Sequence, residues 1–412
     1  MAEVAVPATG DVAMIERRGD RGGLDYDVLV AGAGLVGLSL APALAAAGRS
    51  IALADRAAVT SPAAPAGDDD WDTRVYAISP GSVAFLSSLG AWQTMPADRM
   101  AAVEAMIVEG DGGARLRFSA YELGERALAW IVEERTLKAA LVTSVAQAGV
   151  ALHAPCAFDS LAFGPQGGVL ECGPDTLRAR LVVGADGLRS QVRAAAGIVA
   201  ETKPYAQTAV VANFNCERAH LGRAFQWFHD DGGVLAWLPL PGRRVSMVWS
   251  APHALSRELL DLPLDALAER VAARGRHCLG AFQAMTPAAG FPLQLSTLPT
   301  TVAHRVALVG DAAHGIHPLA GQGVNLGFAD AEALAAVLGD SGPITDPGEP
   351  LLLERFARQR KAPVLAMQYV TDGLARLFGT SLPLARAARN WGMTAVDWLP
   401  PAKRVLAQSA LR

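Results

Sequence analysis

The sequence contains two short, mostly apolar runs that are far apart in the chain. Each run is followed by glycine and then by an acidic residue. In the C-terminal third, the run from Arg305 to Val309 ends at Gly310-Asp311, before a loop rich in glycine and proline. Near the N-terminus, the run from Tyr26 to Ala31 continues into Gly32-Ala33-Gly34-Leu35-Val36-Gly37. An acid at a strand end accepts hydrogen bonds from hydroxyls, and a loop of free backbone N–H groups binds an electron-rich group. The two segments together therefore suit a ligand that carries both hydroxyls and an electron-rich group.

The N-terminal segment has the spacing of a dinucleotide-binding unit. Gly32 makes a tight turn, Gly34 lets the backbone approach a pyrophosphate, and Gly37 lets the following helix pack on the strand. After that helix, a strand at 51–54 ends at Asp55, 18 residues after Gly37, where an acid accepts hydrogen bonds from an adenosine ribose. The alternative is a glycine-rich turn without a ligand. Because strand, glycines, helix, second strand and acid occur in order, the pattern favours dinucleotide binding.

Composition is that of a soluble enzyme. A chain of 412 residues is long enough for two or more domains, and no apolar run approaches the roughly 20 residues of a membrane span. The net charge of −4 argues against a nucleic-acid partner. Residues 1–24 lack the apolar core of a signal peptide and are expected to be a disordered tail.

The four cysteines are scattered. Cys156, Cys172, Cys216 and Cys278 show no CxxC spacing, so the sequence predicts neither a metal site nor a disulfide framework. Unpaired cysteines fit a reducing cytoplasm.

Helix-type and strand-type segments alternate along the chain, which predicts interleaved domains. Helices are expected at 81–89 and 134–148, and a third junction of strand, glycine and acid at 181–187, containing Asp186. Four short β-patterned segments between 209 and 249 predict a second, largely antiparallel sheet. After Asp311 the pattern is helical to the end, with interruptions expected at Pro363, Pro383, Pro400 and Pro401.

The order of these junctions resembles the FAD-dependent aromatic-ring monooxygenases with the para-hydroxybenzoate hydroxylase fold, and within them the ubiquinone-biosynthesis hydroxylases. The resemblance covers about residues 25–405. The matching stretches are Asp72-Thr73-Arg74 with Ala77-Ile78-Ser79, Gly184-Ala185-Asp186-Gly187, Leu238-Pro239-Leu240, and His317-Pro318-Leu319-Ala320-Gly321-Gln322-Gly323-Val324-Asn325-Leu326-Gly327.

The resemblance implies an α/β fold: a Rossmann-like FAD-binding domain interleaved with a mostly antiparallel β-sheet substrate domain, followed by a C-terminal helical region. The expected FAD domain spans 25–200, with an excursion into the sheet domain near 101–125, and resumes at 301–345. The substrate domain is expected at 201–300 and the helical region at 346–412.

The resemblance also implies the site residues. Asp55 would hold the adenosine ribose, Asp311 a ribityl hydroxyl, and Arg74 and Arg135 the phosphate or ribityl region, while Asp186 braces the cofactor. The backbone from Gly321 to Asn325 would follow the flavin's pyrimidine edge. The full expected cofactor set is Gly32, Ala33, Gly34, Val36, Gly37, Asp55, Arg56, Arg74, Arg135, Asp186, Asp311, Pro318, Gly321, Gly323, Val324 and Asn325. The expected substrate pocket is Leu238, Pro239 and His317.

The activity implied is hydroxylation of a polyprenylated phenol through a flavin 4a-hydroperoxide, with non-covalent FAD, dioxygen and NAD(P)H or a separate reductase. This chemistry needs no protein nucleophile, so no catalytic side chain and no metal are expected. Two alternatives remain open: a hydroxylase of a small soluble aromatic, and an FAD-dependent isoprenoid-lipid reductase. A non-catalytic subunit without flavin is a third.

Expected partners are the phenol and other ubiquinone-biosynthesis proteins. The expected location is the cytoplasm, with peripheral contact at the inner membrane. An apolar cluster flanked by arginines, near the C-terminus, either contacts the membrane or packs on the FAD domain. It comprises Leu374, Leu377, Phe378, Leu382 and Leu384, with Arg376, Arg386 and Arg389. His314 and His317 are expected to brace their loop, and Trp227, Trp237 and Trp249 to lie in a sheet core.

Overall fold

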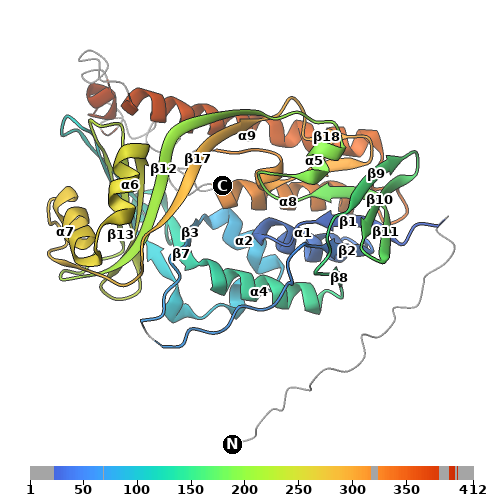
Figure 1. The fold of residues 1–412 in the computed structure, drawn as a ribbon, viewed down its shortest axis with the longest axis horizontal. Coiled ribbons are helices and arrows are strands. Elements are labelled where there is room, and N and C mark those ends of the chain that lie inside the picture. The colour runs from blue at the N-terminus through green and yellow to red at the C-terminus, as the bar shows by residue number, and fades with distance from the viewer. Residues whose placement is uncertain (1–22, 68, 317–322, 380–388, 395–396, 398–412) are drawn as a thin grey trace, which may run out of the picture.

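The computed structural model describes residues 23–67, 69–316, 323–379, 389–394 and 397, and within them the chain forms two large sheets and a small one (Figure 1). The first large sheet has five parallel strands in the order β19-β11-β1-β2-β8, with β18 and the β9–β10 hairpin added antiparallel. These strands are β1 Tyr26–Ala31, β2 Ile51–Ala54, β8 Ala151–His153, β9 Ser160–Gly164, β10 Gly167–Cys172, β11 Asp175–Gly184, β18 Val302–Ala303 and β19 Val306–Leu308.

The second large sheet is antiparallel except where β13 pairs parallel with β5. Its order is β16-β12-β15-β14-β13-β5-β6, and β17 also pairs with the long strand β12. The strands are β5 Ala105–Glu109, β6 Arg115–Ser119, β12 Glu201–Cys216, β13 Arg223–Phe228, β14 Val234–Leu240, β15 Arg244–Pro252, β16 Phe282–Ala284 and β17 Ala289–Thr297. Strands β5 and β6 are the excursion expected near 101–125.

A three-stranded sheet, which the sequence analysis did not predict, lies between the two large ones (Figure 1). It is ordered β3-β7-β4, from Val75–Ile78, Ala129–Glu133 and Ala101–Val103. Because strand side chains alternate between faces, Ile78 and Val132 pack with helix α1, whereas Ala77 and Ile131 pack toward the second sheet. This small sheet therefore joins the two domains.

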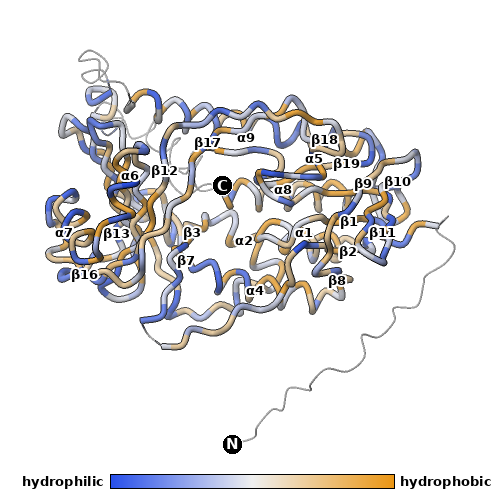
Figure 2. The backbone as a smooth tube through the Cα atoms, in the orientation of Figure 1, coloured by the Kyte–Doolittle hydropathy of each residue, from blue (hydrophilic) through white to orange (hydrophobic). Residues whose placement is uncertain are grey.

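Helices cover both large sheets. The described helices are α1 Leu35–Ala46, α2 Pro80–Ser88, α3 Ala120–Leu123, α4 Glu134–Gln147, α5 Gln191–Ala195, α6 His253–Asp261, α7 Leu264–Arg274, α8 Gly323–Asp340 and α9 Pro350–Gly379, with short 3-10 turns η1 Trp92–Thr94, η2 Ala97–Arg99 and η3 Gly310–Ala312. Apolar residues of α1, α4 and α8 form one core with β1. Figure 2 shows hydrophobic residues along β1 and its neighbours, while α6 and α7 alternate between hydrophobic and hydrophilic residues.

The alternation in α6 and α7 has a direct cause, because these helices cover one face of the second sheet. Trp227, Trp237 and Trp249 are buried in that layer, which confirms that they belong to a sheet core. Residues of the layer such as Leu259 and Leu267 point inward from the two helices, and the charged residues between them face solvent.

Two predictions about local structure are wrong. Pro363 does not interrupt the C-terminal helix, because α9 continues through it with Phe356 buried on one side and Gln368 Nε2 hydrogen-bonded to Ser296 O on the other. The cysteines are not all free: Cys156 and Cys172 form a disulfide, with Cα atoms 5.2 Å apart. The β9–β10 hairpin returns the chain and brings the two cysteines together, which their separation in sequence conceals.

Candidate functional site

The carboxyl ends of four neighbouring parallel strands bring the predicted glycine and acid segments to one edge of the first sheet. Asp55 follows β2, the glycine loop at 32–37 follows β1, Asp186 follows β11, and Asp311 follows β19. Ligands of open α/β sheets bind at this edge, because the strand ends and helix N-termini meet there. The three junctions that lie far apart in sequence are therefore adjacent in space.

The three glycines of the loop are required for different reasons. Gly32 has φ +108°, and a Cβ there would collide with Ala185 O. A Cβ on Gly37 would collide with Gly32 O, because α1 begins close against the turn. Gly34 is exposed, and its Cβ would meet no atom within 4 Å. The protein's own packing thus needs Gly32 and Gly37, whereas the space at Gly34 lies open at the N-terminus of α1 and fits a pyrophosphate.

Asp55 lies directly beside this loop. Its Oδ2 accepts a hydrogen bond from Ala33 N at 2.6 Å, and its Oδ1 accepts one from Ala57 N at 2.8 Å. A carboxylate has about four lone-pair positions, so two remain for ligand hydroxyls. Arg56 is exposed next to it, with its guanidinium 5.6 Å from the ring centroid of Phe158.

Asp186 braces the loop after β11. Its Oδ2 accepts hydrogen bonds from Gln191 N at 2.6 Å and Val192 N at 3.2 Å, which caps the start of α5. Ala185 N donates to Ala31 O at 2.8 Å, so this loop rests on the glycine loop. The contacts support the expected bracing role.

The side chain of Asp311 is accessible to solvent, although many protein atoms surround it. Within the described part of the chain its carboxylate makes no hydrogen bond or ion pair, and Val36 packs against the preceding Gly310. Burial among protein atoms raises the pKa of Asp311, while His314 and Arg74 oppose that shift. Asp311 is therefore an acid at the strand-end edge whose hydrogen-bonding capacity is unused by the described residues.

Arg74, the residue before β3, is close enough to Asp311 to affect its pKa. Its guanidinium lies 5.2 Å from the ring centroid of Tyr76 and 5.3 Å from that of Phe291, and its Nε is 3.5 Å from Glu134 Oε2. Burial raises the pKa of Tyr76, with Arg74 opposing and Asp311 adding to the shift. Tyr76 and Phe291 are site candidates that the sequence analysis missed, because an aromatic residue in a strand resembles any core residue.

The start of α8 reaches the same region. Asn325 is buried; its Nδ2 donates to Ala77 O at 2.8 Å, and its Oδ1 accepts from Ser79 N at 2.9 Å. Gly323 begins the helix, and its Cβ would meet no atom within 4 Å. The side chain of Asn325 therefore ties α8 to β3, and only the backbone of this turn, with Val324, remains for a ligand. His317, Pro318 and Gly321 lie outside the described residues.

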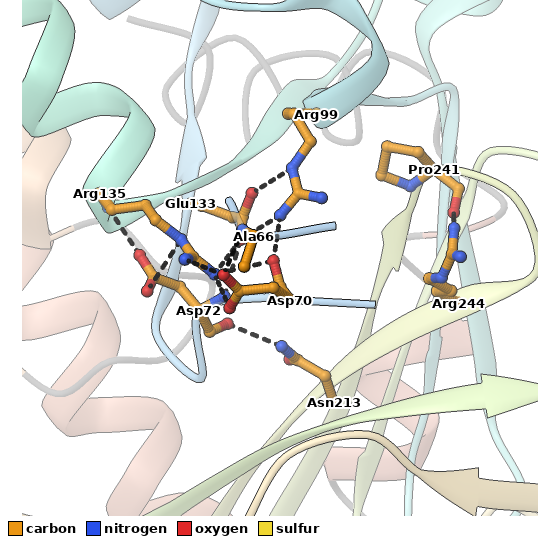
Figure 3. Close-up of polar contacts among 9 residues, drawn as sticks. All are labelled: Ala66, Asp70, Asp72, Arg99, Glu133, Arg135, Asn213, Pro241 and Arg244. Atoms are coloured by element: carbon orange, nitrogen blue, oxygen red, sulfur yellow. Dashed lines mark hydrogen bonds and ion pairs between the residues drawn. The ribbon is translucent and has the colours of Figure 1, made fainter. Parts of the chain in front are cut away.

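Arg135 belongs to an ion-pair network beside the three-stranded sheet (Figure 3). It binds Asp70, with Nη2 to Oδ1 at 2.9 Å, and Asp72, with Nε to Oδ1 at 3.3 Å. Glu133 lies in the same network and pairs with Arg99 at 2.8 Å. The charge of Arg135 is thus already balanced by protein carboxylates, and its contact with the cofactor stays a prediction.

One face of the second sheet packs against helices α6 and α7, and the opposite face packs against the three-stranded sheet. Leu238 packs with Ala77 and Ile131 on the inner face. Pro239 is the next residue of β14 and projects to the other face. The structure therefore does not bring the Leu238 and Pro239 side chains together. The partly exposed inner-face residues Ala236, Leu238 and Val248 form an apolar wall.

The C-terminal cluster is divided between interior and surface. Leu374 packs with Val108 and Leu116 of the second sheet rather than on the FAD domain. Arg389 is buried, paired with Asp111 and hydrogen-bonded to Leu377 O at 2.6 Å, so its expected role at a membrane surface is wrong. Leu382, Leu384 and Arg386 lie outside the described residues, as does the Phe378 side chain. Over the described part, no helix is long and apolar enough to cross a bilayer.

A cavity of about 310 Å³ is lined by residues of β13, α7 and the turn between β5 and β6. Trp227, His229 and Arg274 are among its lining residues. Arg274 and Arg276, its two cationic residues, already pair with Asp231 and Glu109. It is not part of the cleft at the strand ends.

Known proteins resemble the chain over nearly its whole length. A family model described as FAD binding domain matches residues 25–370. Ubiquinone hydroxylase UbiL of Rhodospirillum rubrum is 37% identical, covering 93% of this chain and 89% of the relative. The 3-demethoxyubiquinol 3-hydroxylase of Escherichia coli is 34% identical, covering 93% and 98%. The structure of PqsL of Pseudomonas aeruginosa with 2-aminobenzoylacetate shares the fold, with TM-score 0.74, 22% identity, and coverage of 89% and 99%.

Proposed function

Because the chain belongs to the FAD-dependent hydroxylase family of ubiquinone biosynthesis, we propose that it hydroxylates the aromatic ring of a polyprenylated phenol. The observation that carries the proposal is the pairing of two surfaces. The strand-end edge has unfilled polar capacity at Gly34 and Asp311, and the facing sheet presents an apolar wall around Leu238. The first suits a dinucleotide and the second an apolar ring.

The names of the relatives support this substrate class. The Rhodospirillum relative is a ubiquinone hydroxylase, and the Escherichia relative is a hydroxylase of 3-demethoxyubiquinol. The chain spans at least 89% of both, so the comparison includes the regions on each side of the cleft.

The residues of the edge would hold FAD in a defined direction. Asp55 accepts the hydroxyls of the adenosine ribose, and the N-terminus of α1 with Gly34 receives the pyrophosphate. Asp311 accepts a ribityl hydroxyl, with Arg74 beside it. The N-terminus of α8 at Gly323 faces the flavin's pyrimidine edge, where N–H groups and the helix dipole favour negative charge.

Bound FAD, reduced by NAD(P)H or a separate reductase, supplies the oxygen chemistry: one atom of dioxygen enters the ring and the other leaves as water. The protein's part is to position the two partners and to exclude water. The apolar wall at Ala236, Leu238 and Val248 excludes water. A dry site protects an oxygenating flavin from side reactions.

Oxygen consumption by the FAD-loaded protein tests the proposal directly. With NAD(P)H or a flavin reductase and a short-chain prenylated phenol, we expect oxygen uptake that depends on the phenol and a product heavier by one oxygen atom. Asp311→Ala is the matched negative control. Phenol reduction without oxygen uptake would indicate the isoprenoid-lipid reductase, and turnover of only unprenylated phenols would indicate the hydroxylase of soluble aromatics.

We also propose that the protein is cytoplasmic and meets its lipid substrate by peripheral contact with the inner membrane. The exposed Arg376 and Leu377 near the end of α9 support this surface, since cations beside apolar side chains bind anionic bilayers. Arg376→Glu changes the charge by two units and should lower binding to vesicles containing phosphatidylglycerol by roughly 30-fold, from about 1 kcal/mol per charge. Lys138→Glu on α4, across the molecule, is the charge-matched control; equal flotation of both variants contradicts this surface.

A further inference from the structure

A buried ion pair joins α8 to α9 directly behind the flavin-facing segments. Asp330 of α8 is 1% exposed, and its Oδ1 accepts a hydrogen bond from Arg360 Nε of α9 at 2.7 Å. Its other oxygen, Oδ2, lies 2.5 Å from His314 Nε2 and accepts a hydrogen bond from Gly310 N at 3.0 Å. One carboxylate on α8 therefore binds two other parts of the chain, the turn at 310–314 and helix α9.

The pair persists in the interior because every polar atom of the carboxylate is used. Burial alone raises the pKa of Asp330, but the charges and hydrogen bonds of His314 and Arg360 outweigh it and hold the pKa below its usual value. A buried carboxylate that lost one of these partners would keep its desolvation cost without compensation.

These contacts reach the two proposed flavin-facing segments, the Asp311 turn and the first turn of α8. Gly310 immediately precedes Asp311, and its φ of +59° sets the direction in which the chain leaves β19. His314 holds the next turn. Arg360 also donates from Nη2 to Leu326 O at 3.3 Å, within the first turn of α8 that begins at Gly323.

The opposite side of the α8 N-terminus is fixed independently by Asn325, which bonds Ala77 O and Ser79 N of the β3 region. Asp330 thus links the Asp311 turn to α8 by hydrogen bonds, beside the packing of Gly327 against Gly310. A shift of that turn relative to α8 would require breaking a bond to Asp330.

We propose that Asp330 is a positioning residue: through His314, Gly310 and Arg360 it sets the distance between the Asp311 turn and the N-terminus of α8, and so the fit of the flavin between them. The inference rests on FAD occupying the cleft and does not depend on which ring is hydroxylated.

A second ion pair between the same two helices provides a matched control. Asp340 and Arg355 lie 2.8 Å apart, also from α8 to α9, with side chains 60% and 46% exposed. This pair has the same chemistry but touches no cleft segment. Asp330→Asn and Asp340→Asn remove the same charge from the same helix, and only the former should reach the flavin.

The first measurement needs no catalysis. In FAD-free protein, amide hydrogen exchange of the peptide covering residues 309–316 should be at least about tenfold faster in Asp330→Asn than in wild type. The amide has one acceptor oxygen where the carboxylate has two, so Arg360 and the Gly310 turn can no longer both be satisfied. Asp340→Asn should leave this exchange unchanged. With FAD added, Asp330→Asn should show a shifted visible flavin spectrum and reduction potential, and a dissociation constant about tenfold higher, near 1.4 kcal/mol.

His314→Gln is the second variant and keeps the Asp330–Arg360 pair, so it remains informative if Asp330→Asn fails to fold. It should accelerate exchange at 309–316 and shift the flavin spectrum, with a smaller loss of melting temperature than Asp330→Asn because the Asp330–Arg360 pair is kept. Wild-type exchange and flavin spectrum in either folded variant would overturn the proposal. A shifted spectrum in a protein that hydroxylates no phenol would leave it standing and reject the proposed function instead.

Discussion

Two regions near the centre of the molecule are built from the same residue types, yet they differ in whether their polar groups are satisfied. In the network around Glu133, the carboxylate accepts from Arg99 at 2.8 and 2.9 Å and from Asp72 N at 2.7 Å (Figure 3). At the strand-end edge, Asp311 has no such partner in the described chain, and the space at Gly34 is open.

This difference distinguishes charged groups that stabilise the protein from charged groups that are left to bind a ligand. Unmet hydrogen-bonding capacity in a protein-lined site costs free energy in the folded protein, and a ligand recovers that cost. Saturated groups have nothing left to offer a ligand and instead fix the loop at 70–74, whose last residue is Arg74. The network is therefore a structural support, and the strand-end edge is the proposed binding site.

Of the changes considered, breaking the Glu133 network should have the largest effect, and the quantity affected should be the free energy of unfolding. Arg99→Ala leaves the buried Glu133 with only the longer ion pair to Arg135, at 3.5 Å, and removes the cation 3.7 Å from the Trp71 ring centroid. We expect the free energy of unfolding to fall by about 3–5 kcal/mol, measured by chemical denaturation. Arg115→Ala, an exposed partner of Glu109, should cost no more than about 1 kcal/mol. Equal losses in the two variants would refute the structural role of the network.

Filling the edge should affect binding and leave stability unchanged. Gly34→Val places a side chain in the open space at the start of α1, so the FAD dissociation constant should rise about 100-fold, near 2.7 kcal/mol. The free energy of unfolding of the FAD-free protein should change by no more than about 0.5 kcal/mol. Gly67→Val, at another glycine whose Cβ meets no atom within 4 Å, is the control and should bind FAD as wild type does. The site is misplaced if Gly34→Val also binds normally.

The smallest effect should come from Asp311→Asn. This substitution should weaken FAD binding but stabilise the FAD-free protein. The lost ribityl acceptor should weaken FAD binding about tenfold, or 1.4 kcal/mol. Because the pKa of Asp311 is raised above its usual 3.8, its ionisation destabilises the folded FAD-free protein progressively as the pH rises through the raised pKa.

The FAD-free Asp311→Asn variant should therefore melt at a higher temperature than wild type near neutral pH, and the advantage should vanish below pH 3.8. Thermal scans across pH measure this. A variant less stable than wild type at pH 7 would mean that Asp311 is satisfied within the protein and belongs with the network.

Local spacing was enough to identify the edge. The strands at 26–31 and 51–54 have the expected bounds, and glycines, helix and acid follow one another within one βαβ unit. Such a motif is determined by neighbours in the chain, because turn, helix and strand lengths alone bring Asp55 back beside the glycine loop. The mostly antiparallel second sheet was recognised for the same reason, from its alternating strands.

Only the tertiary structure decided what the remaining charged and apolar residues do. Arg135, a predicted cofactor cation, is also bound by Asp70 and Asp72. Arg389 resembled a surface charge until Asp111 was found against it, 278 residues away in sequence. The Cys156–Cys172 disulfide likewise depends on a hairpin. In each case the partner lies on another element, and the topology alone determines which side chains are left free at the cleft.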